Sequence, residues 1–146
     1  MAKVIEIAIS PYPKGQMRKV ELVEVIAGKG LVNDRYFREN NEKKCQITLI
    51  ESENIKYYNQ TFKTSITFAE FRRNIITEGI RLNELIGSEF FIGDIKVKAH
   101  DLCRPCKYLQ ETLKQNDLIK TMLKKSGIRC EILTNGKIII GSKIKL

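Results

Sequence analysis

The sequence has no tryptophan, one histidine, three prolines and no long run of apolar residues. A chain without such a run has no segment that could cross a membrane as a helix. The first residues, MAKVIEIAIS, alternate like a β-strand and lack the apolar block and cleavage site of a signal peptide. The sequence therefore predicts a cytoplasmic protein.

Ligands for a structural metal are scarce as well. His100 is the single histidine, and the C-x-x-C pair of Cys103 and Cys106 has no second copy. A structural zinc ion needs four ligands, and His100 and Cys103 are awkwardly close along the chain to serve together. We therefore expect no zinc site. In a cytoplasmic protein the cysteines are expected to be reduced, and a close pair is expected to bind metal or act in catalysis.

Negative charge is in the minority, and the formal net charge is +9. A basic surface attracts anions, which include nucleic acid, membrane headgroups and phosphorylated cofactors. The lysines are spread along the chain, and the sequence has no arginine-rich arm, interleaved aromatic motif or zinc-finger spacing. Nucleic-acid binding is therefore not favoured.

The 146 residues suit one domain, 1–146, with one sizeable core. Short alternating or apolar runs predict strands at 4–9, 20–27, 46–50 and 74–77, and a hairpin with Gly93-Asp94 at its tip. In the second of these runs the residues expected to frame the buried face are Val20, Leu22 and Ala27. Many short strands with few helices predict a mainly β, α+β domain built as a closed or partly open β-barrel.

Three helical segments are predicted. The first covers 51–60 with Ser52 as its cap, the second begins near Pro105, and the third runs from Asp117 to Gly127. The chain then closes with two strands around Asn135-Gly136, a dipeptide typical of hairpin turns.

The four cysteines divide into two kinds. Cys130 alternates with apolar neighbours, so we expect a packed core thiol, and Cys45 is taken as structural too. Cys106 follows the proline that is expected to open a helix, and a helix N-terminus favours thiolate. Arg104 and a neighbouring lysine add positive charge, and Cys103 lies close enough to assist or to form a disulfide. The alternative is that Cys103 and Cys106 are ordinary buried cysteines.

Two further stretches carry groups suited to anions. Arg72 and Arg73 are adjacent on a segment expected to be extended, so that one would face a site and the other solvent. Guanidinium groups bind phosphate or carboxylate through two N–H groups at once. The alternative is a solvated pair of charges. Asp34 and Arg35 end a glycine-bearing loop, where a local salt bridge is the usual arrangement.

These stretches, in this order, resemble the MOSC family, the domain found at the C-terminus of molybdenum-cofactor sulfurases. The resemblance covers nearly the whole chain and is carried by GLVNDRYF (30–37), ITLIESENI (47–55), FRRNIITEGIRLNELIGSEFFIGDIKVKA (71–99), LCRPCKYL (102–109) and SGIRCEILTNGKIIIGSKIKL (126–146). It implies a mostly β, barrel-like fold with a cysteine near a cavity.

The resemblance also implies roles for single residues. Cys106 matches the essential cysteine of the family, which is thought to carry sulfur as a persulfide or to bind molybdenum, whereas Cys103 is a feature of a subgroup. Arg72, Arg73 and Asn74 match the block expected to line the site and to hold the anionic pterin phosphate of the molybdenum cofactor. Asp34 and Arg35 match the loop motif, and they are expected at the cofactor site together with Arg104.

The match has two departures, both in the loop that precedes the first helix. Asn33 stands where the family usually has glycine, and Tyr36 stands where it usually has histidine. We also expect a stand-alone unit, without the N-terminal domain of the larger reductases or the pyridoxal-phosphate domain of the sulfurases. Pyridoxal phosphate is thus an association of the family only.

The leading hypothesis is a MOSC protein that binds molybdenum cofactor or carries sulfur on Cys106 for metal–sulfur assembly. Its expected partners are a sulfur donor of the cysteine-desulfurase type and a molybdoenzyme or reductase. Two alternatives stay open: a thiol–disulfide oxidoreductase that uses Cys103 and Cys106, and a non-catalytic basic binding module.

Overall fold

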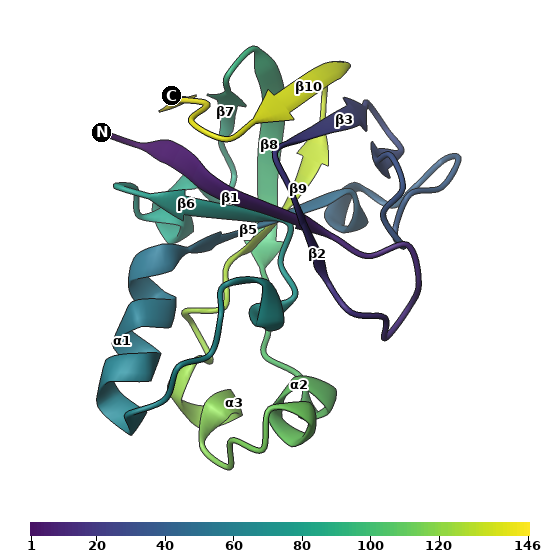
Figure 1. Ribbon diagram of the computed structural model, residues 1–146. Coiled ribbons are helices and arrows are strands. Elements are labelled where there is room, and N and C mark those ends of the chain that lie inside the picture. The colour runs from purple at the N-terminus through teal and green to yellow at the C-terminus, as the bar shows by residue number, and fades with distance from the viewer.

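Strands dominate the fold and form two sheets (Figure 1). The computed structural model describes residues 1–146. The strands are β1 (Lys3–Ile9), β2 (Arg18–Val20), β3 (Leu22–Ile26), β4 (Gly30–Leu31), β5 (Ile47–Glu51), β6 (Ile75–Glu78), β7 (Glu89–Ile92), β8 (Ile95–Leu102), β9 (Ile128–Ile132), β10 (Gly136–Ile139) and β11 (Ile144–Lys145). The α-helices are α1 (Ser52–Phe62), α2 (Lys107–Thr112) and α3 (Leu118–Thr121), and the 3₁₀ helices are η1 (Lys43–Cys45), η2 (Ala69–Phe71) and η3 (Leu82–Leu85).

The larger sheet has eight strands in the order β11-β7-β8-β9-β5-β6-β1-β2, and the smaller has the order β10-β3-β4. The predicted mainly β fold with a few short helices is confirmed. The large sheet curls into a half-barrel, with β3 and β10 on one side and the helices gathered at the opposite end (Figure 1). No helix is both long and apolar enough to cross a membrane.

Each face of the central strands packs against a different core. Leu49 of β5 and Ile75 of β6 belong to the larger cluster, which lies inside the half-barrel, while the next residue of each strand, Ile50 and Ile76, belongs to the smaller one. The alternation follows from strand geometry, in which successive side chains point to opposite faces. The smaller cluster joins the sheet to the helices through Ile55, Tyr58, Phe71, Leu109, Leu118 and Met122.

One connection explains the only parallel pair of the large sheet. β5 leads directly into α1, and the chain returns to pair β6 beside β5 with Leu49 opposite Ile75. Parallel neighbours need a crossover of this kind, commonly a helix. The predicted strand at 46–50 and helix at 51–60 are therefore confirmed. The predicted cap is wrong, because Glu51 is the N-cap and Ser52 is already buried within the first turn.

The strand predicted at 20–27 is divided between the two sheets. β2 pairs with β1, the chain bends at Glu21, and β3 then pairs with β10 and β4. The bend changes which residues face inward, so Val23 and Val25 are buried and Leu22 is 52% exposed. The predicted buried position of Leu22 is therefore wrong.

The hairpin predicted around Asn135-Gly136 does not form. β9 is already paired with β8 on one edge and β5 on the other, so it has no free edge for β10. β10 instead pairs with β3, and the Asn135 side-chain oxygen accepts a hydrogen bond from the Ala27 N–H at 2.7 Å. The helix predicted over 117–127 is also shorter, since α3 ends at Thr121.

Candidate functional site

A cavity of about 220 Å³ lies where the β8–α2 loop meets the segments before β5 and β6. We call it the cysteine cavity. Its lining residues are Arg35, Tyr36, Lys44, Cys45, Thr48, Arg72, Arg73, Asn74, Cys103, Arg104, Cys106 and Arg129. Three stretches that are far apart in sequence thus meet in one place. The structure gathers there every predicted site residue except Asp34, which lies just behind the wall.

Cys106 occupies the N-cap position of α2 and is exposed. Its sulfur accepts a hydrogen bond from the Leu109 N–H at 3.4 Å. The helix therefore begins two residues later than a start at Pro105 would require, and the cysteine itself caps it. The Cys106 sulfur is thus exposed to solvent and held in place by the first turn of α2.

Cys103 is placed differently, although it is only three residues away. Its side chain is 3% exposed, and its backbone N–H donates to the Gly127 carbonyl oxygen at 2.8 Å. Burial raises the pKa of the Cys103 thiol, while Arg73 and Arg129 oppose that shift. The two members of the C-x-x-C pair therefore differ in reactivity, because the thiolate is the reactive form.

Arg72 and Arg73 both line the cavity, so the expected division between site and solvent is wrong. The reason is local backbone geometry. Arg72 has a left-handed conformation, with φ of 65°, where η2 ends and before β6 begins. The turn replaces the extended segment that would have sent the two side chains to opposite faces.

Both guanidinium groups are held by backbone carbonyl oxygens. Arg72 donates to Gly15, and Arg73 donates to Ser126 at 2.9 Å and to Arg104 at 3.2 Å. A guanidinium has five N–H groups, so each side chain keeps donors for a ligand. Burial, and then the neighbouring Arg35, lower the pKa of Arg72, but an arginine starts so far above neutrality that it stays charged.

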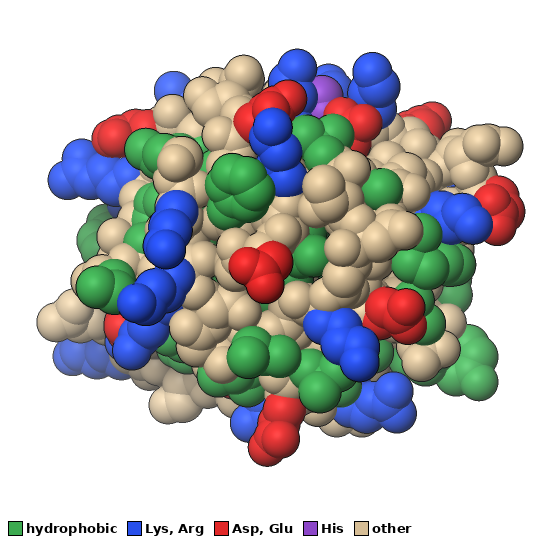
Figure 2. Space-filling model, turned by 90° about the horizontal axis from the view of Figure 1, so that it is seen from above, with side chains coloured by type: hydrophobic (Ala, Val, Ile, Leu, Met, Phe, Trp, Pro, Cys, Tyr) green, Lys and Arg blue, Asp and Glu red, His purple; other side chains and the backbone are tan.

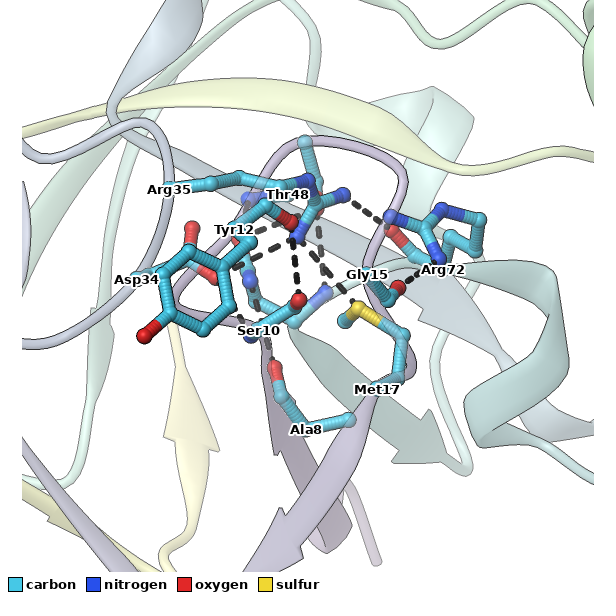
Figure 3. A network of polar contacts seen from close by, with 10 residues as sticks. Ala8, Ser10, Tyr12, Gly15, Met17, Asp34, Arg35, Thr48 and Arg72 are labelled. Atoms are coloured by element: carbon cyan, nitrogen blue, oxygen red, sulfur yellow. Dashed lines mark hydrogen bonds and ion pairs between the residues drawn. The ribbon is translucent and has the colours of Figure 1, made fainter.

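Arg35 is the centre of a polar network that supports this wall (Figure 3). It lies 3.2 Å from the Asp34 carboxylate and donates to the Arg72 carbonyl oxygen at 3.3 Å. The same Asp34 oxygen accepts from the Ser10 N–H at 3.0 Å. The expected local salt bridge between Asp34 and Arg35 is therefore present, and it also fixes the strained backbone of Arg72.

The side-chain amide of Asn74 joins neighbouring strands. Its oxygen accepts from the backbone N–H and the hydroxyl of Thr48, and its nitrogen donates to the Ala8 carbonyl oxygen at 3.2 Å. The residue is 3% exposed. Asn74 thus positions the β1, β5 and β6 walls of the cavity, with its amide committed to protein groups.

The charge of the cavity is strongly one-sided. Six cationic side chains line it, and no aspartate or glutamate does. Three carboxylates lie behind the wall: Asp34 pairs with Arg35, Asp101 lies 3.4 Å from Lys44 and 3.6 Å from Arg104, and Glu42 lies 3.7 Å from the Cys45 sulfur. Six positive charges against three negative ones leave an excess of three. Such a site attracts anions, because a walled cleft of one sign concentrates the electric field.

Five lining residues were not predicted as site residues: Tyr36, Lys44, Cys45, Thr48 and Arg129. Sheet register brings two of them in, since Thr48 of β5 lies opposite Arg129 of β9. Cys45 lies at the end of η1, half buried, so the thiol taken as structural is on the cavity wall. The sequence shows Lys44 only as part of a short lysine cluster before the QITLI strand. The fold is needed to place its side chain at the cavity. Cys130, in contrast, is fully buried in the core as predicted.

A larger groove of about 650 Å³ adjoins the cysteine cavity, and Arg72 lines both. Its wall includes Lys14, Lys19, Tyr108 and Glu6. Arg72 and Lys14 both lie over the Tyr108 ring, at 5.9 and 5.4 Å from its centre. The two hollows therefore share one cationic residue at their boundary.

Conventional metal-ligand clusters are absent. No three side chains of His, Cys, Asp or Glu are placed to hold a metal ion together. His100 Nε2 lies 2.8 Å from a Glu131 carboxylate oxygen and is thereby engaged within the sheet. A metal bound in the cysteine cavity would therefore take most of its ligands from the cofactor that carries it and few from the protein.

Positive charge is not gathered in the same way over the end of the molecule that carries β3 and β10. Figure 2 shows this face from above, with Lys and Arg side chains interspersed among Asp, Glu and exposed apolar side chains. This face therefore differs from the cysteine cavity, which is lined by cations without a carboxylate.

Residues 31–145 match the sequence model of the MOSC domain. The chain belongs to the MOSC domain family. This family is associated with molybdenum-cofactor binding and sulfur transfer.

Solved structures agree with the fold of this MOSC domain. The YuaD protein from Bacillus subtilis has a TM-score of 0.78 at 18% identity, over 98% of this chain and 93% of that one. YiiM from Geobacillus stearothermophilus has a TM-score of 0.81 at 21% identity, over 100% and 75%. YiiM from Escherichia coli has 0.75 at 17%, over 100% and 69%. No curated protein sequence matches the chain.

Proposed function

We propose that this MOSC domain takes up sulfur as a persulfide on Cys106, inside a cavity that binds the anionic end of the molybdenum cofactor. The single observation that carries the proposal is the placement of an exposed, N–H-capped cysteine among six cations with no carboxylate in the lining. Cations and a directed N–H group both favour thiolate. Thiolate is the form that attacks a persulfide and the form that binds a soft metal.

The loading step is balanced within the chemistry of sulfur. The Cys106 thiolate attacks the outer sulfur of a donor persulfide, a new S–S bond forms, and the bond to the donor cysteine breaks. The donor leaves as a thiolate, so one persulfide replaces another without an external oxidant. A cysteine-desulfurase-type protein would supply such a donor, and a molybdoenzyme or reductase would be the partner that uses the product.

The donor set fits the molybdenum cofactor in two respects. Arg72 and Arg73 keep N–H groups free of protein partners and would hold its phosphate, and Cys106 would be the protein's ligand to the metal. The cysteine cavity of about 220 Å³ is smaller than most pockets for organic ligands, so the adjoining groove beyond Arg72 would share in holding the remainder. The bound cofactor would supply a metal centre that accepts sulfur and thiolate ligands.

The proposal is tested by intact mass after incubation with inorganic polysulfide. We expect wild type to gain one sulfur atom at Cys106 and Cys106→Ser to gain none there. Cys130→Ala is the matched control, because that thiol is fully buried in the core and lines neither the cysteine cavity nor the adjoining groove. Equal sulfur gain at this site in Cys106→Ser and wild type would exclude Cys106 as the carrier.

A further inference from the structure

We propose that Cys45 is a second sulfur-carrying residue, which receives sulfur from Cys106 across the cysteine cavity. This inference rests on the proposed function of Cys106 and adds the next step to it. Both thiols line the same cavity, although they are 61 positions apart in the chain and come from different segments.

Cys45 is better suited than Cys103 to accept sulfur. Its sulfur lies 3.7 Å from a carboxylate oxygen of Glu42, so that carboxylate can accept the thiol proton. Cys45 is also half exposed, whereas Cys103 is almost fully buried. Burial raises the pKa of Cys103, which keeps it in the less reactive thiol form. The C-x-x-C spacing therefore points to the wrong partner for Cys106.

One carboxylate ties the two thiol-bearing segments together. Asp101 lies 3.4 Å from Lys44, the residue before Cys45, and 3.6 Å from Arg104, which lies between the C-x-x-C cysteines. The ion cluster places the residue before Cys45 near the loop that carries Cys106. A persulfide on Cys106 also reaches about 2 Å further than the thiol does, the length of an S–S bond.

The transfer is a thiol–persulfide exchange. The Cys45 thiol gives its proton to Glu42, and the resulting thiolate attacks the outer sulfur on Cys106. A bond forms from the Cys45 sulfur to that atom, the bond to the Cys106 sulfur breaks, and Cys106 leaves as a thiolate among the cavity cations. The number of S–S bonds is unchanged, so the step needs neither oxidant nor reductant.

Time-resolved mapping of sulfur in the full chain tests the transfer. Protein is mixed with inorganic polysulfide, alkylated at intervals and digested, and the extra sulfur is assigned to each cysteine peptide. In wild type we expect sulfur on Cys106 first and on Cys45 later. We expect Cys106→Ser to slow the loading of Cys45 at least about tenfold, and Cys45→Ser to leave the sulfur on Cys106. Cys103→Ala is expected to leave the order unchanged.

The outcomes separate this inference from the proposed function. If Cys106 loads and Cys45 never gains sulfur, the transfer is refuted while the carrier role of Cys106 stands. If Cys45 loads equally fast without Cys106, or if Cys103→Ala blocks its loading, the direct transfer is refuted. If Cys106 itself never loads in wild type, the proposed function fails and the transfer fails with it.

Glu42 gives a second, independent test. Glu42→Gln is expected to slow the appearance of sulfur on Cys45 at least about tenfold, because the proton acceptor is lost, and to leave the loading of Cys106 unchanged. Glu39→Gln is the matched control, since Glu39 lies in the same loop, is 75% exposed and pairs with Lys29. Equal rates in the two variants, or an equal loss of loading on Cys106, would refute the role of Glu42.

Discussion

Replacing Arg73 by glutamine should weaken the binding of phosphate to the cysteine cavity far more than the loss of one surface charge does. Arg73 lines the cavity without a carboxylate partner, and carbonyl oxygens of Ser126 and Arg104 fix its orientation. A hydrogen bond to a charged group contributes about 1.5–3 kcal/mol. Since about 1.4 kcal/mol corresponds to a factor of ten, the dissociation constant should rise by roughly 10- to 150-fold.

The assay is calorimetric titration with inorganic phosphate or pyrophosphate at fixed ionic strength. Arg81→Gln is the control for net charge, because Arg81 is 84% exposed, lines neither hollow and meets only Glu84 at 3.9 Å. Arg73→Lys keeps the charge and loses the planar fork, so its effect should be intermediate. Thermal unfolding of each variant checks that the loop stays folded.

Equal losses of affinity in Arg73→Gln and Arg81→Gln would refute this reasoning, because phosphate would then sense only the overall charge. Unchanged affinity in Arg73→Gln would refute it as well. A specific loss in Arg73→Gln alone assigns the anion to the cysteine cavity.

Three further predictions follow from burial and backbone geometry. Iodoacetamide should alkylate the exposed Cys106 of the native protein at least about tenfold faster than Cys103, because burial raises the pKa of Cys103. Similar rates of alkylation, read by peptide mass, would contradict the assigned environments. Burial also raises the pKa of Glu6, one of whose oxygens has no partner, so the folded state favours the neutral carboxyl. This contribution to stability is fully present below the unfolded pKa of about 4.3 and is lost as the pH rises from there through the higher folded pKa. Glu6→Gln should therefore raise Tm near pH 7 and leave it unchanged near pH 3, and equal shifts at both would contradict this. Gly127→Ala should lower the free energy of unfolding by about 3 kcal/mol or more in chemical denaturation, because the new Cβ would collide with a backbone carbonyl of β5. Gly87→Ala is also at positive φ but has nothing near its Cβ position, so it should lower the same free energy by only about 1–2 kcal/mol. Similar losses in the two glycine variants would show that the collision is relieved.

Local pattern predicted most of the strands and one pairing, the β7–β8 hairpin that turns at Gly93-Asp94, but not the pairing of strands that lie far apart in the sequence. The alternation around Leu49 and Ile50 is a property of consecutive residues, and it predicted β5 correctly. The pairing of β10 with β3 depends on which strand edges are already occupied, which no short stretch of sequence records. The bend at Glu21 was missed for the same reason, because it is imposed by two sheets competing for one continuous run.

The site was predictable where residues stand in recognisable motifs. Cys106, Arg72 and Arg73 were found in that way, and the structure brings them together. Cys45 and Arg129 were missed, because each enters the cavity through the arrangement of β5, β9 and η1 and neither belongs to a motif of its own. Tertiary structure alone thus brings these two side chains to the cavity.

The proposed function depends above all on Cys106, whose sulfur would be the reactive atom of a cation-lined site for sulfur and molybdenum cofactor. The most direct measurement is metal analysis together with intact mass, on wild type and Cys106→Ser purified from a host that makes the cofactor. We expect wild type to contain molybdenum or to show a mass gain of one sulfur, and Cys106→Ser to show neither. The same molybdenum and sulfur content in both proteins, or none in either, would contradict it.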